Sequence, residues 1–311
     1  MRAIHFLGVM TLSAGIVGCQ TRPAVAPDSA ASQPAASSSA VLAASTAADW
    51  REVPAEQLLV LTLASGGRVL MELAPDFAPL HADNIRKLAR GRYYDGLAIL
   101  RVQDNYVVQW GDPDEQQPRS VGAAQRTLPG EFSRPMAGLA EFTPLADGDV
   151  YAAQVGHSSG FAAARDAARG QAWLAHCYGA LGVGRGMGAD SGGGPELYVV
   201  IGHAPRHLDR NITLAGRVLQ GMEHLTALPR GTGPLGFYEK PDQYVTIASV
   251  RVAADLPAAE RPAIQVLRTN TPLWAAYVDT RRNRRDPWFI EATGHVDLCN
   301  VGVPVRATPG G

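Results

Sequence analysis

The pattern Gly156-His157-Ser158-Ser159-Gly160 points most directly to covalent chemistry. A serine in G-x-S-x-G is the nucleophile of α/β-hydrolases, where it lies on a sharp turn between a strand and a helix. Such an enzyme also needs parallel strands before the serine, and an acid and a histidine after it. The flanking segments here indicate one all-β domain interrupted by an insertion. A serine hydrolase that uses Ser158 is therefore the third of our hypotheses.

Metal and phosphate chemistry have weaker support. His203 and His207 are spaced as zinc ligands on one helix would be, but Pro205 between them and Gly202 before them argue against a helix. The glycines from 179 to 194 match neither G-x-G-x-x-G nor a Walker loop. The three cysteines form no C-x-x-C pair. The sequence therefore predicts no metal and no cofactor.

Arg101 interrupts an apolar strand-like run, 97–102, and a second such run follows at 106–110. An arginine in this position usually extends its charged head into solvent along apolar surface. A guanidinium that is fixed in place can instead donate hydrogen bonds to an electron pair that appears during a reaction. The pattern by itself leaves both interpretations open.

The segments around Arg101 read as short strands, turns and one helix. The runs 58–63 and 68–73 flank Ser65-Gly66-Gly67, which predicts a β-hairpin. Apolar residues recur at helical spacing between Pro79 and Gly91, which suit the first turn and the cap of a helix. Strands that flank turns in this way are typical of an all-β fold with few helices.

Beyond residue 113 the pattern loosens. We expect residues 113–176 to be a long insertion with a helix around 161–168, and a glycine-rich loop then leads to a strand at 197–201. The chain has 311 residues, 33 of them glycine and 22 proline, which favours turn-rich β architecture. Its formal net charge of −1 gives no basic field for nucleic acid, and no nucleic-acid partner is expected.

The N-terminus resembles an export signal. Arg2 precedes an apolar run at 6–17, which is too short to span a bilayer core of about 30 Å. Ile16-Val17-Gly18-Cys19 resembles the lipobox of bacterial lipoproteins, in which residues 1–18 are removed and the cysteine is lipidated. An ordinary secretory signal is the alternative. Several acyl chains on Cys19 would give stable anchoring.

Residues 19–49 are rich in alanine, serine and proline, with almost no large apolar residue, so we expect a flexible tether. A coil of this length has a root-mean-square reach of about 30 Å. Gln20 is not the aspartate that favours inner-membrane retention. The expected location is the periplasm, anchored by lipid, and the outer membrane rather than the inner one.

Two ordered blocks resemble the cyclophilin family of peptidyl-prolyl cis/trans isomerases. The first comprises Gly91-Arg92-Tyr93-Tyr94-Asp95-Gly96, Ile99-Leu100-Arg101-Val102 and Gln109-Trp110-Gly111-Asp112-Pro113. The second runs from His207 to Val218 and continues with Gly221-Met222. The resemblance implies a mainly β fold, a closed antiparallel barrel of eight strands capped by two helices. The cyclophilin-like domain would span 50–252, with the insertion at about 113–176 and a C-terminal extension at 253–311.

The family resemblance also assigns roles to residues. It implies that Arg101 stabilises the twisted amide of an X-Pro bond and that Gln109 orients Arg101. It implies no metal and no cofactor. It places the residues that contact the proline-containing substrate at Tyr106, Val107, Gly184, Arg185, Glu196, Tyr198, His207 and Leu208.

Three of these residues depart from the family pattern. Arg185 stands where the family has asparagine, Glu196 where it has glutamine, and His207 where it has tryptophan. Glu196 would either bond Arg101 and hold it from the substrate or pair with Arg185. The sequence does not decide between these pairings.

Two features lie in or reach the C-terminal extension. Cys177 and Cys299 would meet oxidising conditions outside the cytoplasm, where they either pair or remain two buried thiols. An arginine cluster, 281–285, follows an amphipathic run at 273–278 and indicates a solvated face, or contact with anionic lipid or a partner.

The leading hypothesis is thus a monomeric, lipid-anchored isomerase that acts on X-Pro bonds of exported polypeptides. The alternative is a cyclophilin-like binding module or chaperone of weak catalytic activity, which holds proline-containing segments in the altered pocket.

Overall fold

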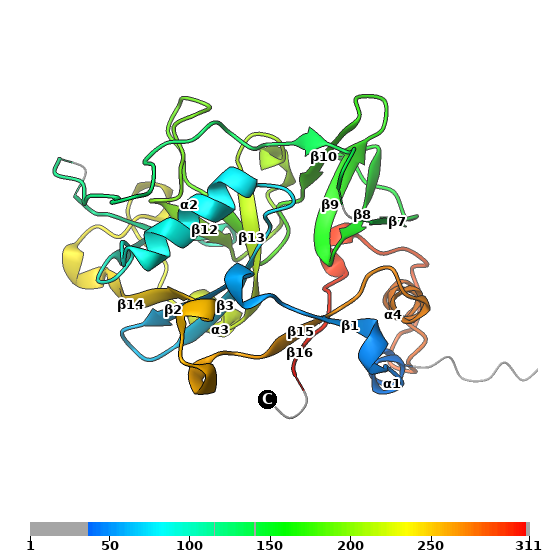
Figure 1. The fold of residues 1–311 in the computed structure, drawn as a ribbon. Helices are drawn as coiled ribbons and strands as arrows, with labels where there is room; N and C mark the ends of the chain where they lie inside the picture. The colour runs from blue at the N-terminus through cyan, green and yellow to red at the C-terminus, as the bar shows by residue number, and fades with distance from the viewer. Residues whose placement is uncertain (1–36, 115, 140, 309–311) are drawn as a thin grey trace, which may run out of the picture. The chain divides into compact units, whose positions relative to one another are not determined.

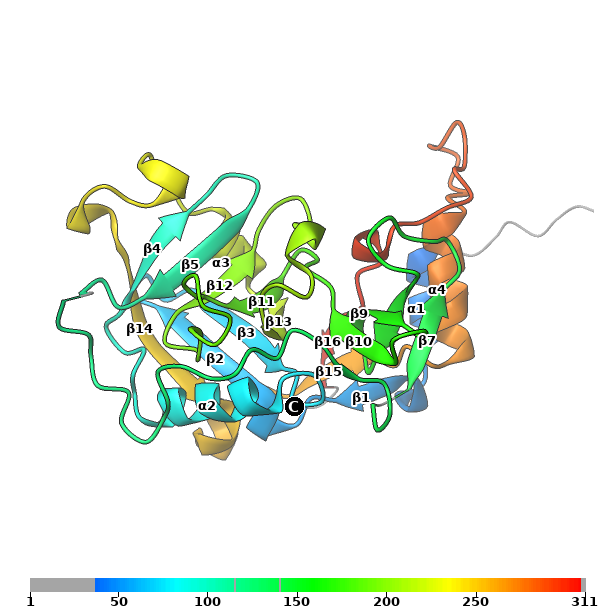
Figure 2. The same cartoon turned by 90° about the horizontal axis from the view of Figure 1, so that it is seen from above.

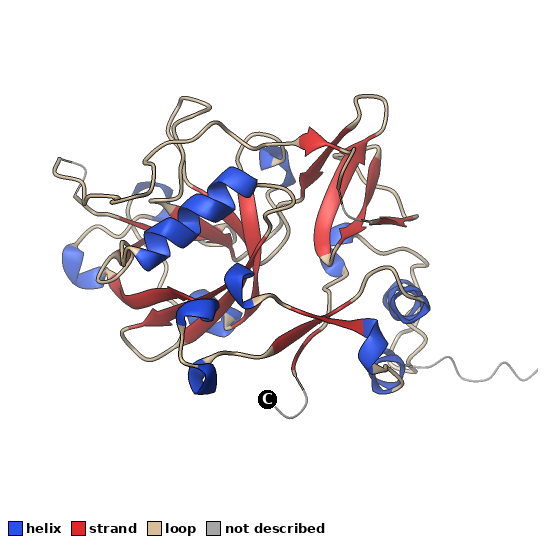
Figure 3. Ribbon diagram, in the orientation of Figure 1, coloured by secondary structure: helices blue, strands red, loops and turns tan. Residues whose placement is uncertain are grey.

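Eight antiparallel strands close into a barrel, in the order β11-β12-β5-β4-β14-β2-β3-β13 (Figures 1 and 3). The structure is a computed structural model that describes residues 37–308 except 115 and 140. The barrel strands are β2 (Leu58–Leu63), β3 (Arg68–Leu73), β4 (Ala98–Val102), β5 (Val107–Gly111), β11 (Ala180–Val183), β12 (Leu197–Val200), β13 (Leu214–Gln220) and β14 (Val245–Val252). The predicted closed barrel of eight strands is confirmed.

Two helices complete the barrel core, as the family resemblance implies. They are α2 (Pro79–Arg90), with proline in its first turn, and α3 (Met222–Thr226). Ile85 and Leu88 of α2 and Leu225 of α3 are fully buried in the same apolar cluster as the inward-facing barrel residues.

Strand β2 is apolar at every position except Thr62 because both of its faces are covered. Leu59 and Leu61 point into the barrel core, whereas Leu58 and Val60 pack outside it against Ile264 and other residues of the C-terminal extension. A strand buried on both sides reads as a continuous apolar run rather than an alternating one. The extension is therefore part of the folded body.

The insertion forms a sheet of its own, in the order β6-β10-β9-β8-β7. Its strands are β6 (Arg134–Pro135), β7 (Phe142–Leu145), β8 (Gln154–Ser158), β9 (Phe161–Asp166) and β10 (Gln171–Leu174). The predicted helix around 161–168 is wrong, because this segment is β9. Its alanines have helical propensity, but Ala163 and Ala164 are fully buried between two neighbouring strands, and packing overrides so weak a preference.

A three-stranded sheet joins the two ends of the described chain. Strand β15 (Ile264–Leu267) lies between β1 (Trp50–Glu52) and β16 (Val305–Ala307). Beside this sheet, helix α1 (Ser38–Ala43) packs on α4 (Pro272–Arg282), as the views of Figures 1 and 2 agree.

The expectation of a tether as far as Asp49 is wrong for residues from Ser38 onward. The side chain of Ser37 caps α1 by accepting from the amide of Ala40 at 3.2 Å. Val41 is buried in one apolar cluster with Trp274 and Tyr277 of α4. The predicted signal sequence, Cys19 and the start of the tether lie outside the described residues.

The remaining helical segments are single 3-10 turns: η1 (Ala47–Asp49), η2 (Ala55–Gln57), η3 (Arg206–Leu208), η4 (Pro234–Gly236), η5 (Pro241–Gln243), η6 (Ala253–Asp255), η7 (Ala258–Glu260) and η8 (Leu298–Asn300). Within the described part of the chain, no helix is both long and apolar enough to cross a bilayer.

Candidate active site

Arg101 lies on β4 directly opposite Gln109 of β5. The β4–β5 register shifts between Ile99 and Arg101, which is where the strand re-aims its side chains. The Nη1 of Arg101 donates to Oε1 of Gln109 at 3.0 Å, and its Nη2 donates to Oε1 of Gln103. Burial lowers the pKa of Arg101 and Tyr106 opposes that shift. A guanidinium stays protonated at neutral pH even so.

Glu196 is held by Gln109 rather than by an arginine. The Nε2 of Gln109 donates to Oε2 of Glu196 at 3.0 Å, so the amide of Gln109 bridges the guanidinium and the carboxylate. Arg185 turns elsewhere and donates from Nε to the carbonyl oxygen of Asn211 at 2.9 Å. Among the described residues, neither of the two ion pairs considered from the sequence, Glu196 with Arg101 or with Arg185, is present. Neither pairing forms, because Gln109 lies between Arg101 and Glu196 and Arg185 bonds the backbone of Asn211 instead.

A loop far along the chain, which carries Leu235 and Phe237, also contacts Arg101. The carbonyl oxygen of Leu235 accepts from Nε of Arg101 at 2.7 Å. The ring centroids of Tyr106 and Phe237 lie 5.5 and 5.4 Å from the guanidinium carbon, so the cation is within cation–π range of two aromatic rings. Sequence reasoning missed Leu235 and Phe237. Only the glycines at 231, 233 and 236 marked this loop as one whose backbone approaches another segment closely.

The residues assigned to the proline pocket are brought together in part. Val107 and Tyr198 are buried in one apolar cluster, against which Tyr106 packs. Leu208 is half-buried and His207 is exposed on η3, and neither belongs to that cluster in the described chain.

Gly184 lies against Glu196, where an added Cβ would come within 2.9 Å of the glutamate Cβ. Arg185 and Glu196 are both exposed. The charged substitutions therefore lie at the rim and the apolar residues lie deeper.

The barrel and the insertion match a family of known proteins. Residues 58–252 match the family model described as cyclophilin type peptidyl-prolyl cis-trans isomerase/CLD. The chain belongs to the cyclophilin family. The matched range begins with β2 and ends with β14, so it coincides with the barrel and the insertion that it contains.

Curated relatives match over shorter stretches. A probable peptidyl-prolyl cis-trans isomerase of Brucella suis is 35% identical over 88 residues, which is 25% of this chain and 44% of the relative. A peptidyl-prolyl cis-trans isomerase of Schizosaccharomyces pombe is 43% identical over 47 residues, 15% of this chain and 30% of the relative. The chain thus spans less than half the length of these relatives.

A solved cyclophilin structure has a wider likeness. The crystal structure of cyclophilin AquaCyp293 from Hirschia baltica has a TM-score of 0.65 and 25% sequence identity, and the match covers 83% of this chain and 94% of that one. This likeness extends beyond the residues that the family model matches.

A buried chain of hydrogen bonds begins at Tyr198, one of the residues assigned to the proline pocket. Tyr198 Oη lies 3.0 Å from Nε2 of His176, whose Nδ1 lies 2.9 Å from Asp209. Asp209 accepts from Nε of Arg206 at 2.6 Å, and Arg206 also pairs with Asp149 of the insertion at 2.8 Å. Burial lowers the pKa of His176, although Asp209 opposes this. A neutral His176 that donates to Asp209 accepts from the hydroxyl of Tyr198. The insertion is thereby connected to Tyr198.

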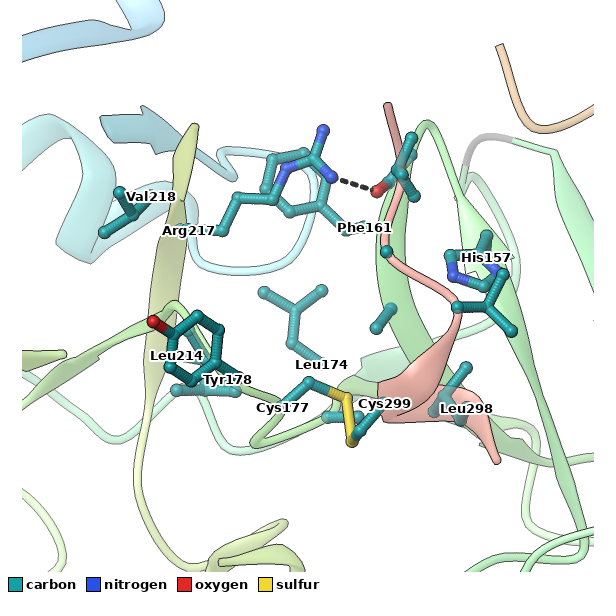
Figure 4. Close-up of a pocket in the computed structure, with 18 of the residues that line it drawn as sticks. His157, Phe161, Leu174, Cys177, Tyr178, Leu214, Arg217, Val218, Leu298 and Cys299 are labelled. Carbon is teal, nitrogen blue, oxygen red and sulfur yellow. Dashed lines mark hydrogen bonds between the residues drawn. A yellow bond between two sulfur atoms is a disulfide. The ribbon is translucent and has the colours of Figure 1, made fainter. Parts of the chain in front are cut away.

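A separate cavity of about 180 Å³ lies where the barrel, the inserted sheet and the extension meet (Figure 4). Cys177 and Cys299 form a disulfide at one side of it, and Arg217 lies across from them, donating to the carbonyl oxygen of Gly160. Arg217 also pairs with the buried Glu72 at 3.0 Å. Of the described residues that line this cavity, none belongs to the predicted isomerase site.

The hydrolase hypothesis is wrong in its local geometry. Ser158 ends β8, and Ser159 and Gly160, with φ of 49° and 86°, turn the chain directly into the antiparallel strand β9. A nucleophile elbow needs a helix after the turn and an accessible hydroxyl. Ser158 is only 2% exposed.

Proposed function

We propose that this cyclophilin is a peptidyl-prolyl cis/trans isomerase that acts on X-Pro bonds of exported polypeptides, with Arg101 as the catalytic residue. The observation that carries the proposal is a guanidinium that Gln109, Gln103 and Leu235 hold in one place. Tyr106 lies beside it and packs on the apolar cluster that would receive the proline ring.

The chemistry follows from the amide bond. Resonance gives the C–N bond a rotational barrier of roughly 18–20 kcal/mol. As the bond twists, the proline nitrogen becomes pyramidal and gains a free lone pair. A donor fixed at that point binds the twisted amide more strongly than the planar one and so lowers the barrier.

Arg101 keeps donors for this task. A guanidinium has five N–H groups. Three of them have acceptors among the described residues, which leaves one N–H on Nη1 and one on Nη2 for a substrate. Apolar walls next to these groups would exclude water and strengthen the interaction.

We test this with the cis/trans exchange of an Ala-Pro peptide, measured by NMR. The native chain should accelerate exchange, and Arg101→Ala should lower the rate by about 10²–10³, the loss typical of a removed transition-state donor. Arg68→Ala, which removes an exposed arginine of β3, is the control and should leave the rate unchanged. No acceleration by the native chain would refute the isomerase. Acceleration that survives Arg101→Ala would refute the role of Arg101.

The second candidate, a binding module, is favoured by the exposed charges of Arg185 and Glu196, which stand where the family has uncharged side chains. It predicts chemical-shift changes at the proline of the peptide without faster exchange. The NMR experiment therefore separates the two functions.

We also propose that acyl chains on Cys19 anchor the protein in the periplasm, at the outer rather than the inner membrane. The apolar run at 6–17, the lipobox-like residues before Cys19 and Gln20 support this. The Cys177–Cys299 disulfide supports export, because disulfides persist in oxidising compartments. The mass of the mature N-terminal peptide tests the anchor, and Cys19→Ser should release the protein from membranes.

A further inference from the structure

The turn that follows α4 presents large apolar side chains that the rest of the fold leaves uncovered. Trp288 is 82% exposed and Ile290 is fully exposed. The amide of Phe289 donates to the carbonyl oxygen of Asp286 at 2.9 Å, which closes a β-turn with Pro287 and Trp288 at its centre. Proline fixes φ at the first central position and is favoured there. The turn therefore holds Trp288 at its tip.

Contacts on the inner side of the turn keep this shape. The rings of Trp288 and Phe289 meet edge to face, with centroids 4.9 Å apart. The guanidinium carbon of Arg284 lies 5.2 Å from the centroid of Phe289. Phe289 is thus covered from two sides, while Trp288 and Ile290 face outward. We call residues 284–290 the aromatic turn.

The aromatic turn lies near the point where the described chain begins. The hydroxyl of Ser38 lies 2.6 Å from that of Thr280, in the last turn of α4, so the chain enters the fold beside the end of the helix from which the turn continues. Figure 2 shows the loop after α4 extending past the end of that helix. Cys19 precedes Ser37 by 18 positions, which limits its distance from Ser37 to about 60 Å.

Charge contributes little to the aromatic turn. The turn has two cations: Arg285, which pairs with Asp279 of α4 at 2.9 Å, and Arg284. Asp286 adds a further negative charge within the turn. The net charge of the segment is therefore small, and its contact surface is set by tryptophan and isoleucine. Tryptophan is the side chain that concentrates at the interface of lipid and water.

We propose that the aromatic turn rests on the surface of the bilayer that holds the Cys19 lipid, with Trp288 and Ile290 at the level of the headgroups. This inference rests on the lipid anchor of the proposed function. A single attachment by acyl chains leaves a domain free to rotate, and a second apolar contact gives it one orientation.

Quenching of tryptophan fluorescence tests the contact. The lipidated full chain is reconstituted into phosphatidylcholine vesicles with brominated or ordinary acyl chains, and its N-terminal peptide is weighed by mass spectrometry. The other tryptophans are buried, at positions 50, 110, 173 and 274, so the signal at the surface comes from Trp288. Brominated lipid should quench the native chain, and Trp288→Phe should abolish that quenching. Adding phosphatidylglycerol should change it little.

A matched control moves the reporter to another exposed site. Met187 is 99% exposed in the glycine-rich loop of the barrel. The double variant Trp288→Phe, Met187→Trp should show no quenching by brominated lipid. If the chain is acylated but brominated lipid does not quench Trp288, the contact is overturned and the anchor stands. This is also the result expected if the turn binds another protein instead of the bilayer. Equal quenching in the double variant overturns the single orientation. A chain without acyl groups overturns the anchor and this inference together.

Discussion

The carbonyl oxygen of Leu235 accepts a hydrogen bond from Nε of Arg101 at 2.7 Å, although 134 positions separate the two residues. Leu235 adopts a φ of 57°, in the left-handed region that side chains other than glycine and asparagine rarely occupy. Its side chain is 67% exposed, so its contribution to the site is its backbone. The conformation of one loop residue therefore helps to aim the guanidinium.

Leu235→Pro should lower the isomerase rate. Proline holds φ near −65°, which the observed φ of 57° excludes, so the carbonyl must move away from Arg101. A hydrogen bond to a charged group contributes about 1.5–3 kcal/mol, which corresponds to a roughly ten- to hundredfold loss. Leu235→Asn tolerates the left-handed region and should keep the rate. NMR exchange measures both variants, and equal rates would contradict the role of the carbonyl.

Glu196 should act on the rate through Gln109. Glu196→Leu removes the acceptor for Nε2 of Gln109 and frees this amide to rotate away from Arg101. The acceptor is a carboxylate, but Glu196 is exposed and solvent weakens the bond, so we assign it about 0.5–1.5 kcal/mol and expect a loss of roughly two- to tenfold. Glu196→Gln retains an acceptor and should stay near the native rate. A faster Glu196→Leu variant would show instead that the carboxylate restrains Arg101.

The disulfide should stabilise the fold without affecting catalysis. Cys177 and Cys299 are 122 positions apart, and closing so long a loop in the unfolded chain contributes about 4–5 kcal/mol. The double variant Cys177→Ala, Cys299→Ala should lose stability of this order in urea unfolding. Its exchange rate at 25 °C should be native, because the bond lies outside the cluster around Arg101. Reduced and alkylated native chain should behave like the variant, and an unchanged midpoint would contradict the prediction.

His157 should make the fold sensitive to acid. Burial lowers its pKa from 6.5 to about 3, with Arg217 acting in the same direction. The folded protein therefore takes up the proton less readily than the unfolded chain. The stability from this residue is complete above about pH 6.5 and is lost as the pH falls toward 3, by up to about 1.4 kcal/mol per pH unit.

Urea unfolding at a series of pH values measures this effect. Between pH 6.5 and 4 the free energy of unfolding of His157→Gln should fall less steeply than that of the native chain. His203→Gln replaces an exposed histidine away from this site and is the control, which should leave the slope unchanged. Parallel slopes for the native chain and His157→Gln would contradict the lowered pKa of His157 in the folded protein.

Local patterns determined more of the strands around Arg101 than of the insertion. Alternation and turn residues placed the strands around Arg101 and Gln109, since both are properties of neighbouring residues. In the insertion the same local view failed at Phe161–Ala168, where small alanines are compatible with either structure. Burial between β8 and β10 made this segment a strand.

By itself the sequence determined the two strands on either side of the turn at Asp104-Asn105, because strand pairing across a short turn is a local property, and its family blocks implied the closed barrel and the contact of Gln109 with Arg101. Tertiary structure alone decided that Leu235 and Phe237 hold Arg101, that Gln109 separates it from Glu196, and that α1 packs on α4 next to the aromatic turn. Each of these contacts joins residues far apart in the chain. Their partners are chosen by packing and by the need of buried polar groups for acceptors, neither of which a local pattern records.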